Sequence, residues 1–102
     1  MWENEKESGL ATKDQIKTKT PSDYRVIMHN DDYTTMDFVV SVLMIVFNKP
    51  AVEATQIMLD VHKKGAGICG IFTKEIAETK IELTHQRAKE AGYPLHCSME
   101  KV

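Results

Sequence analysis

Apolar residues in this chain recur at the spacings of strands and helices only after an N-terminal stretch. Residues 1–22 alternate charged and small polar side chains without an apolar period and end in a Thr-Pro-Ser run, which predicts a flexible tail. The β-branched and aromatic run 24–29 precedes the turn-forming residues 30–32 and therefore predicts a first strand. We expect residues 23–102 to form the folded core.

The next apolar run has the period of a helix. Five of its residues share one helical face: Met36, Val39, Val40, Leu43 and Phe47. Thr34 stands three residues before Asp37, close to a capping-box pattern, and is the expected N-cap. Because the opposite side of this helix is also apolar, we expect neighbouring elements to cover most of it.

A second helix and a second strand are predicted between Pro50 and Phe72. Pro50 is suited to open the helix, and Gly65 with Gly67 is expected to end it. The short apolar run 68–72 that follows lies between glycine and threonine residues, which is typical of a buried strand.

The rest of the chain predicts a third helix and a third strand. Thr73 is the expected N-cap of a helix that runs to Ala91, where Gly92 and Pro94 stop it. Apolar and polar residues then alternate over 95–100, which indicates a half-buried strand. The order β-α-α-β-α-β predicts an α+β fold with three helices on a small three-stranded antiparallel sheet.

Composition narrows the classes of function. The 102 residues suffice for one domain with a single small core. The net charge of −2 and the lack of a basic run disfavour nucleic-acid binding. No segment reaches the roughly 20 apolar residues of a membrane span, and no secretory signal is apparent. Cys69 and Cys97 lack metal-ligand spacing, so we expect reduced core thiols in a cytoplasmic protein.

Two groups of residues could carry chemistry. Asn30, Asp31, Asp32 and Thr34 lie between a strand and a helix, where such residues often serve only as turn and cap residues. Carboxylates there could also accept hydrogen bonds from a cation or an amine. His62 shares a helix surface with Met58 and Val61, which places an imidazole beside an apolar patch. A lone histidine at that spacing is more often simply a residue of the helix surface.

Enzyme motifs are not apparent in the sequence. It contains no glycine-rich phosphate loop, no His-Glu-x-x-His and no Gly-x-Ser-x-Gly motif. A metal-dependent hydrolase that uses Asp31, Asp32 and His62 is a weak alternative. We expect no catalytic activity, no cofactor and no bound metal.

Several segments together resemble one family of proteins, the ClpS adaptors. In chain order they are Asn30-Asp31-Asp32-Tyr33-Thr34, Met36-Asp37-Phe38-Val39, Ala54 to His62, Gly70-Ile71-Phe72-Thr73, Ala77-Glu78-Thr79-Lys80 and Cys97. The resemblance runs from Tyr24 to Val102 without large gaps. It implies the same fold order that the periodicity predicts.

The resemblance also implies a function. Members of this family bind N-degrons, which are protein N-termini that begin with Leu, Phe, Tyr or Trp, and deliver them to a Clp AAA+ unfoldase and its peptidase. By resemblance, Asn30, Asp32 and His62 would hold the α-amino group, and Asp31 beside them would contact the start of the peptide. The first side chain would enter a hydrophobic pocket, whose expected lining is Thr34, Met36, Val39, Met58, Val61 and Leu95.

Further expectations concern the partner. By resemblance, Glu75 and Lys80 would contact the N-terminal domain of a ClpA-like or ClpC-like unfoldase, with this chain acting as a monomer. Where the family usually has proline, this chain has Thr35, which could loosen the edge of the pocket. An alternative function is that of a ClpS-like modulator or inhibitor of the unfoldase that binds N-degrons weakly.

Overall fold

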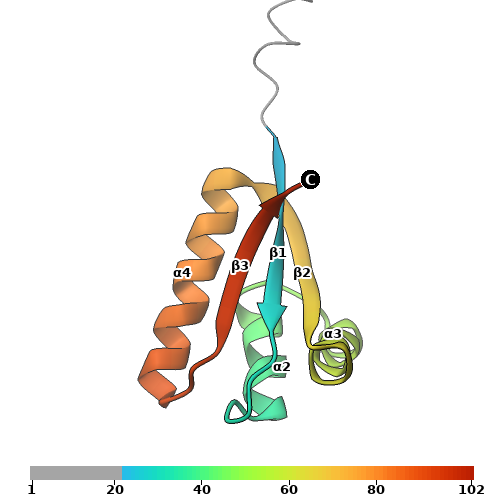
Figure 1. The fold of residues 1–102 in the computed structure, drawn as a ribbon, viewed down its shortest axis with the longest axis vertical. Coiled ribbons are helices and arrows are strands. Elements are labelled where there is room, and N and C mark those ends of the chain that lie inside the picture. The colour runs from blue at the N-terminus through green and yellow to red at the C-terminus, as the bar shows by residue number, and fades with distance from the viewer. Residues whose placement is uncertain (1–21) are drawn as a thin grey trace, which may run out of the picture.

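A computed structural model describes residues 22–102 of the chain (Figure 1). The flexible tail expected over 1–22 therefore lies outside the described residues, apart from Ser22. The elements follow the predicted order β-α-α-β-α-β. Their bounds are β1 Asp23–His29, α2 Met36–Ile45, α3 Ala51–Lys64, β2 Ala66–Thr73, α4 Lys74–Ala91 and β3 His96–Lys101.

The three strands form one antiparallel sheet in the order β2-β1-β3. Val26 in the central strand pairs with Gly70 on one side and Met99 on the other, and the register with β2 shifts between Val26 and Ile27. Figure 1 shows β1 between the two outer strands, with α4 beside β3 and α3 beside β2. The predicted fold class, three helices with a three-stranded antiparallel sheet, is confirmed.

Among residues 22–102, the helices cover one face of the sheet and leave the other open. The side chains that point into the core alternate along the strands, as the period of two requires, and include Val26, Met28, Cys69 and Cys97. On the opposite face, Ile68 and Ile71 remain 52% and 55% exposed. The core is completed mainly by apolar residues of the helices: Val39, Val42, Leu43, Ala54, Ile57, Val61, Ala77 and Ala88.

The boundaries of the helices differ from the predicted ones in two places. The N-cap of α2 is Thr35, not Thr34, because Thr35 Oγ1 accepts a hydrogen bond from Phe38 N at 3.2 Å, while the hydroxyl of Thr34 is bonded to Asp31. Gly65 alone ends α3, in the left-handed conformation at φ 89°. Gly67 is already part of β2, which begins earlier than predicted because Ala66 pairs with His29.

Both cysteines are free and buried, as the sequence predicts for core thiols. The hydrogen bond with the neighbouring thiol of Cys69 raises the pKa of Cys97 above its usual range, and burial raises it further. The Cys97 thiol therefore stays protonated and unreactive. Among residues 22–102, no helix is both long enough and apolar enough to cross a bilayer.

Candidate functional site

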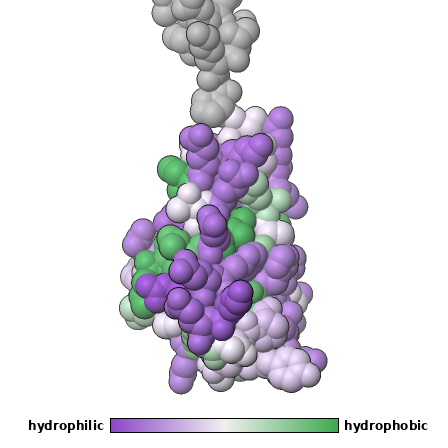
Figure 2. Space-filling view, turned by 90° about the vertical axis from the view of Figure 1, so that its left-hand side faces the viewer, coloured by the Kyte–Doolittle hydropathy of each residue, from purple (hydrophilic) through white to green (hydrophobic). Residues whose placement is uncertain are grey.

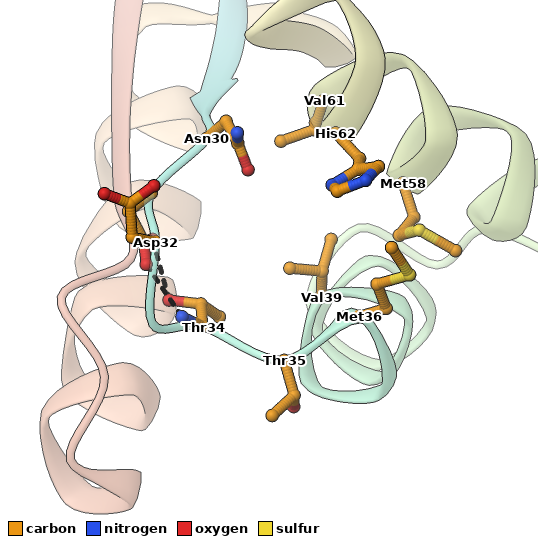
Figure 3. A pocket seen from close by; sticks show the side chains of 10 residues that line it. Asn30, Asp32, Thr34, Thr35, Met36, Val39, Met58, Val61 and His62 are labelled. Carbon is orange, nitrogen blue, oxygen red and sulfur yellow. Dashed lines mark hydrogen bonds between the residues drawn. The ribbon is translucent and has the colours of Figure 1, made fainter.

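A pocket of about 380 Å³ lies where the loop after β1 meets the first turn of α2 and the last turns of α3 (Figure 3). This volume suits a single bulky side chain or a small molecule. The lining residues come from segments about thirty positions apart in sequence. They are Asn30, Asp31, Asp32, Thr34, Thr35, Met36, Val39, Met58, Val61 and His62.

The rim of the pocket is polar and exposed. Figure 3 shows the Asn30 side chain and the His62 ring approaching the opening from opposite elements, the end of β1 and helix α3. Asp32 lies on the same loop as Asn30 and is exposed. Within residues 22–102, no hydrogen bond involves the side chain of Asn30, Asp32 or His62. Their oxygen and nitrogen atoms are therefore available to a ligand.

The inner part of the pocket is apolar. Val39 on α2 and Val61 on α3 are 6% and 3% exposed and form its floor, because both side chains belong to the core where the two helices pack. Met36 and Met58 close one side, and their side chains lie near each other in Figure 3. Methionine has a flexible unbranched side chain, so this wall can adapt to the shape of a ligand.

The loop that carries the polar rim is fixed at both ends. At its start, the backbone N–H of Asn30 donates to the carbonyl oxygen of Gly65, the C-cap of α3, at 3.0 Å. At its end, Thr35 caps α2, and its carbonyl oxygen accepts a hydrogen bond from Val39 N at 3.1 Å. The loop thus ties the end of one pocket-forming helix to the start of the other.

Asp31 organises the middle of this loop. Its Oδ1 accepts hydrogen bonds from the N–H groups of Tyr33 at 2.8 Å and Thr34 at 2.7 Å, and its Oδ2 accepts one from the Thr34 hydroxyl at 2.7 Å. Partial burial alone would raise the pKa of Asp31. The three hydrogen bonds outweigh this effect and lower the pKa, so the carboxylate is ionised at neutral pH.

The structure brings together nine of the ten residues that were expected around a ligand. The exception is Leu95, which is 5% exposed, belongs to the core just before β3 and does not line the pocket. Thr35, expected at the edge of the pocket but not among its lining residues, does line it, and its side chain points away from the opening in Figure 3. The sequence signal for Thr35 is its position directly before the helical apolar run. Thr34 offers the same kind of side chain one residue earlier and was therefore predicted as the cap instead.

The two residues expected at a partner surface differ in their surroundings. Glu75 is exposed in the first turn of α4. Lys80 is part-buried: its Nζ donates to the carbonyl oxygen of Val46 at 2.7 Å and lies 5.3 Å from the centre of the Phe72 ring. Figure 2 shows the α4 side of the molecule as largely hydrophilic with scattered apolar spots. Ile76 and Leu83 of this helix are 48% and 44% exposed.

The geometry gives no support to a metal centre in the described part of the chain. Among residues 22–102, no three His, Cys, Asp or Glu side chains form a group that could hold a metal ion. Asp31, Asp32 and His62 share the pocket but do not make such a group.

Comparison with known proteins places this chain in one family. The sequence profile of the ATP-dependent Clp protease adaptor protein ClpS matches residues 19–98. The chain is 59% identical over 86 residues to a protein of that name from Syntrophus aciditrophicus, covering 84% of this chain and 80% of the relative. It is 50% identical over 102 residues to one from Nitratidesulfovibrio vulgaris, with 100% of both chains covered.

A solved structure agrees with this assignment. The structure of Agrobacterium tumefaciens ClpS2 bound to L-phenylalaninamide matches with a TM-score of 0.79 and 35% identity, covering 81% of this chain and 100% of that one. The sequence-based resemblance is confirmed by these matches. The chain belongs to the ClpS family of ATP-dependent Clp protease adaptor proteins.

Proposed function

We propose that this chain binds the free N-terminus of proteins that begin with Leu, Phe, Tyr or Trp and delivers them to a Clp AAA+ unfoldase. The observation that carries the proposal is a single pocket in which exposed hydrogen-bond acceptors surround an apolar floor. L-phenylalaninamide, the ligand of the A. tumefaciens relative, combines a free α-amino group with a benzyl side chain, which are the two features that such a pocket suits.

The polar rim suits an α-ammonium group. A free α-amino group has a pKa of about 7.7–8.0, so it is mostly a cation near pH 7 with three N–H donors. Asn30, Asp32 and His62 supply acceptors from both sides of the opening, and the ionised Asp31 lies beside them. An internal peptide nitrogen carries one donor and no charge, which explains how the rim would select the end of a chain.

The apolar floor suits the first side chain. Burying a Leu or Phe side chain contributes roughly 1.5–3 kcal/mol, and each hydrogen bond to a charged group contributes a similar amount. Neither contribution alone gives tight binding, whereas their sum reaches affinities on the order of micromolar. Recognition therefore requires a free amine and a bulky apolar side chain on the same residue.

Delivery would use a surface away from the pocket. We propose that Glu75 and Lys80 on α4 contact the N-terminal domain of a ClpA-like or ClpC-like unfoldase, with one copy of this chain acting alone in the cytoplasm. Lys80 has one donor engaged by Val46 O, which leaves two of its three N–H donors for a partner. Glu75 is exposed and free to pair with a basic residue.

The test is a titration with a fluorescent peptide that begins with Phe, beside the same peptide acetylated at its N-terminus. Acetylation removes the charge and two donors but leaves the benzyl side chain unchanged, so we expect binding to weaken at least about a hundredfold. Equal affinity for both peptides would refute the proposal. Weak binding of Phe- and Leu-starting peptides together with an effect on unfoldase activity would favour the alternative function of a modulator.

A further inference from the structure

The two adjacent carboxylates of the rim differ in what they contact. Asp31 uses both oxygens inside the loop, where they accept three hydrogen bonds from Tyr33 and Thr34 at 2.7–2.8 Å. Asp32 is more exposed, and within residues 22–102 its side chain shows no hydrogen bond. The dashed lines that end at Thr34 in Figure 3 are its two hydrogen bonds to the carboxylate of Asp31, which carries no label there. Neighbouring residues of the same type thus have separate tasks.

The hydrogen bonds of Asp31 close a tight turn directly after Asn30. A carboxylate that accepts from the N–H groups two and three residues ahead holds the backbone of the intervening residues, here Asp32 and Tyr33, in one conformation. Asn30 is held independently by its N–H bond to Gly65 O. The direction of the Asp32 side chain is therefore set by Asp31 on one side and the anchored Asn30 on the other.

Thr34 extends this arrangement toward the apolar part of the pocket. Its N–H and its hydroxyl both bond to Asp31, and the next residue, Thr35, caps α2. Met36 and Val39, which line the pocket, lie in the first turn of that helix. Loss of the turn would consequently let the acceptor side chain of Asp32 move. It would also loosen the start of α2, the helix that carries this wall of the pocket.

We propose that Asp31 is a positioning residue for ligand binding, which fixes Asp32 and Thr34 around the pocket through its turn rather than by bonding to the amine. This inference rests on the proposed function of the pocket. It predicts that the oxygen geometry of residue 31 matters more for affinity than its charge.

Substitution of Asp31 by Asn and by Ala separates geometry from charge. Asparagine keeps an Oδ1 acceptor for the N–H groups of Tyr33 and Thr34, and its amide can donate to the Thr34 hydroxyl, which is able to accept. Asp31→Asn should therefore bind a Phe-starting peptide within about threefold of the wild type, since the charge it loses is partly screened. Asp31→Ala leaves both N–H groups without a partner and should bind about tenfold or more weakly.

Asp32→Asn is the matched control, because it removes the same charge from a residue that is free to bond to the ligand. It should weaken binding about tenfold or more, because the carboxylate that would face the α-ammonium group becomes a neutral amide, which keeps an acceptor oxygen but loses the ion pair. Amide exchange at Tyr33 and Thr34, followed by NMR, should accelerate in Asp31→Ala and remain near wild type in Asp31→Asn. Thermal unfolding by circular dichroism identifies variants that have lost the fold, and the exchange rates are compared only among folded ones.

Equal losses of affinity in Asp31→Asn and Asp31→Ala would overturn the inference and assign Asp31 to the amine directly. Unchanged amide exchange in Asp31→Ala would also overturn it. Failure of the proposed function is recognised separately, because the wild-type protein would then bind free and acetylated peptides equally well. The titration of the wild type thus decides the function, and the pair of residue-31 variants decides the role of this carboxylate.

Discussion

Gly67 permits the close approach of β2 to α3, so a single added methyl group there should affect both stability and the pocket. Gly67 is buried, and a Cβ at this position would lie 2.9 Å from Val61 Cγ2 and 3.2 Å from the carbonyl oxygen of Ile57. Valine in a helix has essentially one side-chain rotamer, and a backbone carbonyl cannot turn away, so neither neighbour can move cheaply. Val61 also lines the pocket, which means its displacement changes the floor.

The expected size follows from two opposing effects. Inserting a methyl group into a packed core costs about 1–3 kcal/mol, whereas replacing glycine by alanine in a strand recovers about 0.5–1 kcal/mol of backbone entropy. Gly67→Ala should therefore lower the free energy of unfolding by as much as about 2.5 kcal/mol. It should also weaken binding of a Phe-starting peptide, because Val61 is pushed toward the space that the first side chain would fill.

Urea unfolding and peptide titration of Gly67→Ala, beside Gly92→Ala, test this reasoning. Gly92 has φ 81° and no atom within 4 Å of an added Cβ. Alanine there costs about 1–2 kcal/mol of stability through backbone strain, at a helix end that does not line the pocket. The control should lose stability and keep its affinity. A Gly67→Ala protein that matches the wild type in both stability and affinity would refute the close-packing argument.

Four other changes should have distinct effects. Met36→Ala should open the pocket mouth and improve binding of an Ile-starting peptide by about tenfold, as burial of that side chain allows; unchanged selectivity would contradict a wall role for Met36. His62→Ala should weaken Phe-peptide binding about ten- to a hundredfold with an unaltered circular dichroism spectrum, and a collapsed spectrum would mean that His62 is structural. Thr35→Val should lower the free energy of unfolding by about 0.5–2 kcal/mol and Thr35→Ser by much less; equal losses would exclude the cap. Burial and the nearby His96 lower the pKa of His85, so the unfolded chain binds a proton more readily than the folded one. The free energy of unfolding should therefore fall as pH drops below about 6.5. The same dependence of this free energy on pH in His85→Gln would refute the prediction.

The fold could be predicted because its elements bury regular faces. Side chains that enter the core follow the period of their element. This period appears as alternation at Val26 and Met28 in the strand and as helical spacing at Ala54, Ile57 and Val61. Boundaries were harder to predict because neighbouring residues compete for the same hydrogen bonds. Thr34 has the sequence context of a cap, yet Asp31 takes both its N–H and its hydroxyl, and the capping role passes to Thr35.

Candidate residues of the site could be predicted from the family resemblance, but their hydrogen bonds could not. Pattern alone does not distinguish Asp31 from Asp32, since the difference arises from how the loop folds back on itself. It also does not show that Lys80 lies against Phe72 and bonds to Val46 O, because Val46 is 34 residues away in sequence. The family resemblance places Leu95 in the pocket, but its side chain packs in the core, a placement that the resemblance does not reveal.

The proposed recognition of an N-terminus by an exposed rim requires a rigid loop. Asn30, Asp32 and His62 are exposed. Exposed acceptors exchange bonds to water for bonds to a ligand, so a ligand gains more affinity when these atoms are held in place before it arrives. The loop meets that need because Gly65 O holds its start and the Thr35 cap holds its end. Changes that loosen either anchor should therefore weaken the binding of all peptides alike, whatever their first residue. Changes in the apolar floor should instead alter which first residue is preferred, so the two classes of variant are separable by their selectivity.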